Sequence, residues 1–336
     1  DRMLMAVKMI KVHGSGNDFY LLDQTQFPEP LTDKGLKQLA INICKRDGAG
    51  LYEGADGVLV VDKSEHAHVL GRMRVINADG TEASMCGNGL RTVARYLGTQ
   101  NDADNFRVET MYADLKVQAV ADFAKQVPAY SVEISPVSFD AKTLGMHANH
   151  EAQTIINETI PELKSELKFS AVAVPNPHLI AFVDHATLVG DELGRIGEWL
   201  NDGKNTIFPD GVNVSFVEVL GQNSIFVRTF ERGVGFTNAC GTAMSASSLM
   251  YVLLHQESTD FNQEIQVTNP GGMVKTVVHQ GADEEYWMEL IGNATFVKIV
   301  SLPLTDALAA DFTQASATIT GEQAAYEDFV TSLTTA

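Results

Sequence analysis

Two stretches of this chain repeat one another, and the repeat limits the possible folds more than any other feature. Met73–Gly89 reads MRVINADGTEASMCGNG, and Val227–Ala243 reads VRTFERGVGFTNACGTA. They align without a gap at an offset of 154 residues, the separation of Cys86 and Cys240. A chain of 336 residues is long enough for two ordinary domains. The repeat therefore predicts two homologous lobes.

The order of expected elements also repeats, judged from alternation, β-branched content and Gly/Pro punctuation. In the first half we expect strands at 9–12 and 19–23, a helix at 36–44, strands at 58–61 and 72–76, a helix at 87–97, and strands at 106–110, 115–121 and 131–134. In the second half we expect strands at 171–174 and 179–183, a helix at 193–200, strands at 212–219 and 225–230, a helix at 241–255, and strands at 265–268, 274–278, 287–290 and 296–300.

This order predicts an α+β fold of two pseudosymmetric lobes. The stretch 241–255, GTAMSASSLMYVLLH, is apolar nearly all round, as is typical of a buried helix. We therefore expect each lobe to be a β-sheet or barrel wrapped around a central helix. The expected boundaries are 1–138 for the N-terminal lobe, 139–303 for the C-terminal lobe with a polar linker in 139–168, and 304–336 for an acidic, Ala/Thr-rich tail, either a peripheral helix or loose.

Charge and composition exclude several classes of function. The formal net charge of −19 disfavours binding to nucleic acid or to anionic membranes. No apolar run approaches the ~20 residues of a membrane span, and the N-terminus does not resemble a secretory signal. Three cysteines imply no disulfide framework. We expect a cytoplasmic protein.

Two thiols at equivalent helix starts suggest a specific chemistry. A helix N-terminus can lower the pKa of a thiol, and its unpaired amides bind anions. Inversion of a carbon stereocentre by proton exchange needs a base on one face and an acid on the other. A thiolate and a thiol from pseudosymmetric lobes, facing each other across a cleft, would supply both. Amides aimed at the substrate carboxylate would stabilise the carbanion, so neither a metal nor a cofactor is expected.

Other interpretations of the cysteines remain open at this point. A buried cysteine is most often a small hydrophobic residue, which is how we interpret Cys44 at the end of an apolar helix. The pair Cys86 and Cys240 could also form a disulfide or a redox switch. Their matching context, each before a glycine and a helix, favours catalysis.

Several motifs together resemble the diaminopimelate epimerase family. They are HGSGNDF at 13–19, GADGV at 54–58, NADGTEASMCGNGLR at 77–91, NPH at 176–178, ERGVGFTNACGTA at 231–243 and PGG at 270–272. They occur in family order across residues 8–300. The resemblance implies a two-lobed fold and cofactor-independent, two-base epimerisation of LL- to meso-diaminopimelate, a step in making lysine and peptidoglycan.

The resemblance also implies roles for individual residues. Cys86 is the expected proton donor and Cys240 the expected acceptor in the LL-to-meso direction, while His178 and Glu231 tune the thiols. Backbone amides at the starts of the two helices are the expected cradle of the substrate carboxylate. The expected ligands of the substrate are Asn17, Asn77, Gly87, Asn88, Asn176, Asn213, Glu231, Arg232, Gly241 and Thr242. The guanidinium of Arg232 can donate two hydrogen bonds to the distal carboxylate, and asparagine side chains both donate and accept hydrogen bonds.

The sequence departs from the family pattern in places. Ala243 and Met244 stand where relatives commonly have smaller residues, and Thr92 follows Arg91 where relatives often have cysteine. We allow for a homodimer, although no tyrosine occurs at 296–299, where relatives often place a dimer contact. Two alternatives are a racemase of another amino acid, such as histidine, and a non-catalytic thiol redox or binding protein.

Overall fold

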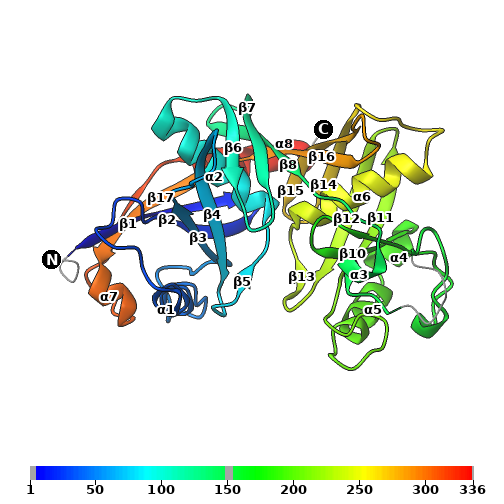
Figure 1. Ribbon diagram of the computed structural model, residues 1–336, viewed down its shortest axis with the longest axis horizontal. Coiled ribbons are helices and arrows are strands. Elements are labelled where there is room, and N and C mark those ends of the chain that lie inside the picture. Colours follow the sequence, from blue (N-terminus) through cyan, green and yellow to red (C-terminus); the bar gives the residue numbers. More distant parts are fainter. Residues whose placement is uncertain (1–4, 148–153, 335–336) are drawn as a thin grey trace. The chain divides into compact units, whose positions relative to one another are not determined.

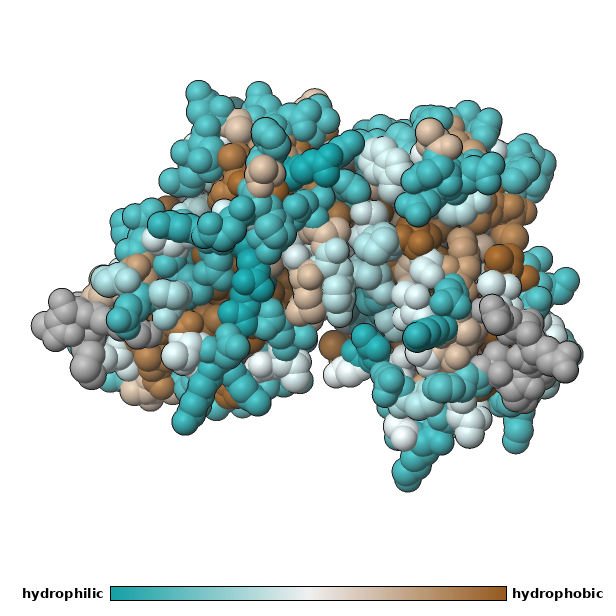
Figure 2. Space-filling model, viewed as in Figure 1, coloured by the Kyte–Doolittle hydropathy of each residue, from teal (hydrophilic) through white to brown (hydrophobic). Residues whose placement is uncertain are grey.

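The computed structural model describes residues 5–147 and 154–334, which form two compact units. Unit 1 contains residues 1–132 together with 292–336, and unit 2 contains residues 133–291. Figure 1 shows both units and their elements. The face drawn in Figure 2 is largely hydrophilic on each unit, in keeping with a net charge of −19. In the described part of the chain, no helix is both long and apolar enough to span a bilayer.

Unit 1 is built on a mixed sheet. Its elements in chain order are β1 (Ala6–Gly14), β2 (Asn17–Asp23), α1 (Asp33–Ile43), β3 (Gly57–Asp62), β4 (Val69–Asn77), β5 (Glu82–Ala83), α2 (Gly87–Asn101), β6 (Asn105–Glu109), β7 (Asp114–Ala124) and most of β8 (Val127–Ile134), and then, after unit 2, β17 (Thr295–Pro303), α7 (Leu304–Leu308), β18 (Ser316–Ile319) and α8 (Glu322–Thr334).

Unit 2 repeats this order. Its elements are α3 (Ala141–Leu144), a 3₁₀ turn η2 (Pro161–Leu163), β9 (Ser170–Ala173), β10 (Pro177–Phe182), α4 (His185–Val189), α5 (Glu192–Leu200), β11 (Asn213–Gly221), β12 (Ser224–Glu231), β13 (Gly235–Thr237), α6 (Gly241–Leu254), β14 (Glu264–Asn269), β15 (Gly272–Gln280) and most of β16 (Tyr286–Asn293).

The strand pairings confirm the repeat. In unit 1, β1–β2 is antiparallel, β2–β3 parallel, β3–β4 antiparallel, β4–β6 parallel and β6–β7 antiparallel. In unit 2, the pairs β9–β10, β10–β11, β11–β12, β12–β14 and β14–β15 follow the same sequence of directions. In the chain, helix α2 lies between the short strand β5 and strand β6, and helix α6 lies between the short strand β13 and strand β14. The units are therefore pseudosymmetric, as the sequence predicted.

Each of these two helices packs inside its own unit. Helix α2 contacts strands β1, β2, β4 and β7, and α6 contacts β9, β10, β11, β12, β14 and β15 (Figure 1). Every residue of α6 from Gly241 to Val252 is buried. A helix enclosed in this way must be apolar on all sides, and the small residues among its first eight allow strands to approach closely. The expected central helices are confirmed.

The boundaries differ from the expected ones. Strand β17 pairs along its length with β1, so residues 292–303 belong to unit 1 and not to the C-terminal lobe. The tail is neither loose nor separate, since β18 pairs with β17 and α8 contacts β17 and β7. The expected linker 139–168 instead contributes buried Leu144, Ile160 and Leu163 to the core of unit 2. Residues 148–153 of it lie outside the described residues.

Candidate functional site

Cys86 is the N-cap of α2, and its sulfur takes part in two hydrogen bonds. The backbone N–H of Gly89 donates to Sγ at 3.3 Å, and Sγ lies 3.4 Å from Oδ1 of Asn17. A hydrogen bond from a backbone amide at a helix N-terminus favours the thiolate form of a cysteine. A bond to the amide oxygen of Asn17 requires the thiol as donor. The site can therefore hold Cys86 in either protonation state.

A tight hairpin brings Asn17 to this sulfur. Ser15 and Gly16 connect β1 to β2 with positive φ values of 54° and 82°, as in a type I′ turn. Strand β2 then begins at Asn17, opposite Gly14. Nδ2 of Asn88, in the first turn of α2, also lies 3.4 Å from Oδ1 of Asn17. Two expected substrate ligands thus meet beside Cys86.

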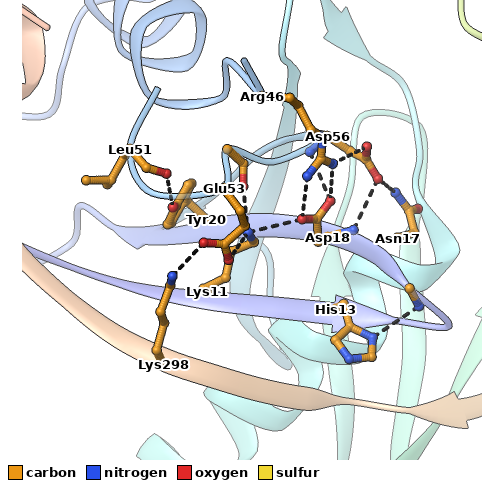
Figure 3. A network of polar contacts seen from close by, with 12 residues as sticks. Lys11, His13, Asn17, Asp18, Tyr20, Arg46, Leu51, Glu53, Asp56 and Lys298 are labelled. Atoms are coloured by element: carbon orange, nitrogen blue, oxygen red, sulfur yellow. Dashed lines mark hydrogen bonds and ion pairs between the residues drawn. The ribbon is translucent and has the colours of Figure 1, made fainter. Parts of the chain in front are cut away.

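A charged network fixes the other end of the Asn17 amide (Figure 3). Nδ2 of Asn17 donates to Asp56 at 2.6 Å. Arg46 bridges Asp56, at 2.7 Å, and Asp18, at 2.5 Å. Burial, and then the charge of Asp18, raise the pKa of Asp56. Buried Lys11 adds a second cation at 3.1 Å from Asp18. The orientation of Asn17 is therefore set, with its oxygen toward Cys86.

Asn77 and Gly87 complete the expected residues of unit 1. Asn77 ends β4, is half-buried, and donates to Oγ1 of Thr81 within its own turn at 3.1 Å. Gly87 is the first residue of α2 and is buried. The structure thus gathers Asn17, Asn88 and Gly87 around Cys86.

In unit 2, Cys240 is the N-cap of α6, and Thr242 stands beside it. Oγ1 of Thr242 lies 3.6 Å from Sγ of Cys240, 3.0 Å from Nε2 of His178 and 3.0 Å from Nδ2 of Asn176. The amide of Asn176 must donate to this hydroxyl. The hydroxyl proton is then available to the sulfur. His178 and Asn176 therefore reach Cys240 through Thr242.

His178 is fully buried and neutral. Burial, and then the charge of Arg232, lower its pKa from 6.5 to about 3. Among the described residues Nδ1 has no hydrogen-bond partner, whereas Nε2 also lies 3.2 Å from Oδ1 of Asn176. A proton on Nε2 can serve that acceptor, and an unpartnered lone pair on Nδ1 costs less than an unpartnered N–H. His178 is thus a fixed, uncharged donor.

Asn213 and Gly211 position the loop that carries Arg232. Oδ1 of Asn213 accepts from the backbone N–H of Arg232 at 2.8 Å, and its Nδ2 donates to the carbonyl of Pro177 at 3.2 Å. Gly211 has φ of +83°, and a Cβ there would lie 2.9 Å from Cδ of Arg232. The side chain of Arg232 is exposed, and Glu231, the last residue of β12, is half-buried beside it. Asn213 therefore holds the Arg232 loop in place through hydrogen bonds from its side chain to the backbone.

Comparison with known proteins identifies the family of this chain. The diaminopimelate epimerase family model matches residues 9–137 and 170–297. A diaminopimelate epimerase of Lactiplantibacillus plantarum is 86% identical over 98% of this chain and 99% of its own. This chain belongs to the diaminopimelate epimerase family. A diaminopimelate epimerase of Enterococcus faecalis is 56% identical, again over 98% of this chain and 99% of its own.

Solved structures show that the fold is shared more widely than the diaminopimelate epimerase family. A phenazine biosynthesis protein of the PhzF family from Bacillus anthracis matches with a TM-score of 0.63 and 17% identity, over 89% of this chain and 99% of its own. A hydroxyproline epimerase of Agrobacterium vitis matches with a TM-score of 0.59 and 14% identity, over 90% of this chain and 92% of its own. At these identities the likeness concerns the fold alone.

Sequence reasoning missed four supports of the candidate site. Thr242 was expected to act through its amide, yet its hydroxyl contacts three other site residues. Asp56 lies in the motif GADGV, and Arg91 in the motif NADGTEASMCGNGLR. The motifs therefore included both residues but did not indicate what either side chain does. Arg46 gave no signal because it follows an ordinary surface helix.

One cluster among the described residues has the geometry of metal ligands, on the surface of unit 1. Nδ1 of His66 lies 2.8 Å from Asp114 and 3.6 Å from Glu109. The hydrogen bond to Asp114 raises the pKa of His66. The cluster is thus already held as an ion pair, and no other observation there points to a metal.

Proposed function

We propose that this protein interconverts LL- and meso-diaminopimelate by a two-base mechanism that uses Cys86 and Cys240. The observation that carries the proposal is the equivalence of the two thiols. Each is the N-cap of a buried helix, at the same point of the same topology, in one of two pseudosymmetric units. Inversion by proton transfer needs two similar groups, one ionised and one protonated, and this pair meets that need.

The proton steps follow from the contacts of each sulfur. In the LL-to-meso direction, the Cys240 thiolate removes the proton of the α-carbon, and the C–H electron pair remains on carbon. The thiol of Cys86 then delivers its proton to the opposite face, and its bonding pair stays on sulfur as a thiolate. The hydroxyl of Thr242 stabilises the first thiolate, and the N–H of Gly89 the second. The roles of the thiols exchange in the reverse direction.

The carbanion between these steps needs electrostatic stabilisation. In the first turns of α2 and α6, the backbone N–H groups of Gly87, Asn88, Gly241 and Thr242 have no acceptor within their helix, and they suit the carboxylate of the reacting end. Preorganised donors of this kind stabilise developing charge without reorganisation. No metal or pyridoxal is required by this scheme.

The distal end of the substrate is a second amino acid that does not react. Exposed Arg232 can bind its carboxylate in a bidentate manner. Asn17, Asn77 and Asn176 offer amide groups that accept from the ammonium and donate to the carboxylate. Glu231 supplies a negative charge for the ammonium. Asn213, whose amide is bonded to the backbone on both sides, supports Arg232.

The proposal extends to the setting of the protein. Thiols that must stay reduced for catalysis suit the cytoplasm. A homodimer is compatible with the proposal but is not needed by it, since both thiols come from one chain.

Turnover with purified protein tests the function and its alternatives. We expect LL-diaminopimelate to give the meso form, with activity insensitive to chelators and abolished by thiol alkylation. Epimerisation of histidine but not of diaminopimelate would favour a racemase of another amino acid. Absence of any turnover under reductant would favour a redox or binding protein. Inhibition by a chelator would contradict the metal-free scheme.

A further inference from the structure

A buried cation lies five residues after Cys86 on the same helix. Arg91 is the largest fully buried side chain of the described residues, with 0% exposure. Its chamber is closed by glycines: a Cβ at Gly14 or at Gly292 would lie 2.7 Å from atoms of the guanidinium. A charged group enclosed so tightly is strongly destabilising unless its charge is compensated. The groups that compensate the charge of Arg91 therefore indicate its role.

The hydrogen-bond partners of Arg91 are all neutral. Nη1 donates to Oδ1 of Asn88 at 2.7 Å, Nη2 to Oγ of Ser15 at 3.1 Å, and Nε to the carbonyl of Asn293 at 3.1 Å. No carboxylate of the described residues pairs with it. These bonds give each guanidinium nitrogen one partner but leave the positive charge of Arg91 unbalanced.

The titratable groups packed around Arg91 leave one candidate for the counter-charge. On α8, burial raises the pKa of Tyr326 to about 12, so its phenol is uncharged. On β1, burial lowers the pKa of His13 to about 4, so its ring is neutral. Lys11 and Asp18, the other charges that act on His13, neutralise each other in their ion pair. On α2 itself, the remaining group is Cys86. Asn88, which accepts from Arg91, lies 3.4 Å from Oδ1 of Asn17, and the same oxygen lies 3.4 Å from Sγ of Cys86.

The second unit lacks this cation. At the offset that aligns the cysteines, Arg91 corresponds to Ser245 on α6. Oγ of Ser245 donates to the carbonyl of Gly241 at 3.0 Å, an ordinary bond within the helix. The equivalent place beside Cys240 therefore holds a neutral side chain. Two thiols in the same fold position stand in different electrostatic environments.

We propose that Arg91 is a positioning residue whose buried charge stabilises the Cys86 thiolate, making Cys86 a stronger acid than Cys240. This deepens the two-base function proposed above and rests on it. In the LL-to-meso direction, the sulfur of Cys86 gains negative charge as it releases its proton to carbon, and Arg91 stabilises that charge. In the free protein the same charge favours the form in which Cys86 is the thiolate and Cys240 the thiol.

Thiol titration tests the proposal without turnover, so it is independent of the proposed substrate. The rate of alkylation of Cys86 is followed against pH in a Cys240→Ala background. Cys44 does not interfere, because burial raises its pKa to about 12. We expect Arg91→Met to raise the titration midpoint of Cys86 by about one unit or more, which is about a tenfold loss of thiolate below the midpoint. Arg91→Lys, which keeps the charge, is expected to restore most of this shift.

Arg95 provides a matched control on the same helix. Its guanidinium lies one turn further along α2 and is paired with Glu322 at 2.6 Å. Arg95→Met removes a charge that is already balanced, so the midpoint of Cys86 is expected to stay in place. An unmoved midpoint in folded Arg91→Met would overturn the proposal. So would an equal shift in Arg91→Lys, since packing would then be the cause.

A comparison of the two native thiols keeps the proposal testable if Arg91→Met does not fold. Cys86 is titrated in the Cys240→Ala variant, and Cys240 in the Cys86→Ala variant, which removes coupling between them. Each rate is scaled to its own plateau at high pH, so that differences in exposure cancel. We expect the lower midpoint for Cys86. A midpoint equal to or above that of Cys240 would contradict the proposal.

Discussion

The hydroxyl of Thr242 is the clearest case of a single group on which the site depends. It contacts Cys240, His178 and Asn176, and it is the group placed to donate to the Cys240 thiolate. A hydrogen bond to a charged partner contributes about 1.5–3 kcal/mol. Thr242→Val is therefore expected to lower kcat by about 10- to 100-fold. Steady-state kinetics in both directions checks this.

Thr242→Ser is the matched control for that substitution. It keeps the hydroxyl and removes only a methyl group, so it is expected to retain most of the activity. Equal losses in Thr242→Val and Thr242→Ser would show that shape, and not the hydroxyl, matters at this position.

His178 makes the stability of unit 2 depend on pH. Its pKa is about 3 in the folded protein against an ordinary value of 6.5, so the unfolded chain binds the proton more tightly. The stability is complete above about pH 6.5 and decreases as the pH falls toward 3, by about 2 kcal/mol at pH 5. In urea titrations of unit 2, His178→Gln is expected to lose less stability than the parent between pH 7 and pH 5. An equal loss would show that His178 is not the group responsible.

At the scale of elements, the C-terminal helix α8 supports the β1–β2 hairpin, which presents Asn17 to the candidate site of unit 1. Tyr326 packs against the ring of His13 with centroids 4.6 Å apart, and Gln323 bonds to Nε2 of His13 at 2.8 Å. His13 in turn is one residue before the turn that presents Asn17, and its Nδ1 accepts from the N–H of Gly16 at 3.1 Å. Helix α8 is thus connected to the hairpin that carries Asn17 through the buried ring of His13.

Tyr326→Ala tests this connection. Removing a buried aromatic ring is expected to destabilise unit 1 by about 3 kcal/mol and to lower kcat, because the hairpin loses its support. Asp328→Ala, at an exposed position of the same helix, is the control and should change neither. Denaturant unfolding and kinetics give both quantities. Normal kcat in folded Tyr326→Ala would show that α8 does not influence the hairpin.

The sequence predicted the elements well where the repeat supported them. The two cysteine helices and the strands around them were expected because each half confirmed the other, and α6 was also marked by its apolar composition. The predicted boundary of the C-terminal lobe was wrong at residues 292–303, where no repeat exists. Strand β17 follows unit 2 in sequence but pairs with β1, a contact between residues about 290 positions apart that no local pattern reveals.

The site was predicted to a similar degree and for similar reasons. Cys86, Asn17 and Asn88 do meet in unit 1, and in unit 2 Cys240, His178 and Asn176 each contact the hydroxyl of Thr242. Their supports were missed because each depends on tertiary packing. Arg91 is a charged residue on a helix, which a sequence pattern assigns to the surface, and only the glycines at 14 and 292 give it room inside.

At the scale of the whole molecule, the two-base mechanism requires one thiol from each unit. Cys86→Ala and Cys240→Ala are therefore each expected to lower epimerisation by about 100- to 10,000-fold or more, the usual value of a general acid or base. Cys44→Ala is the control and should keep the activity, because Cys44 lies in the hydrophobic core of unit 1. A single essential cysteine would contradict the two-base mechanism.

Isotope exchange during a first turnover distinguishes a two-base from a one-base mechanism. LL-diaminopimelate is incubated with the protein in deuterated water, and both the product and the remaining substrate are analysed at early times. With two thiols acting on opposite faces, the meso product carries one deuterium at the inverted α-carbon, and the recovered LL substrate carries almost none. Deuterium appearing in the LL substrate as fast as in the product would mean that one base serves both faces, and would contradict the account.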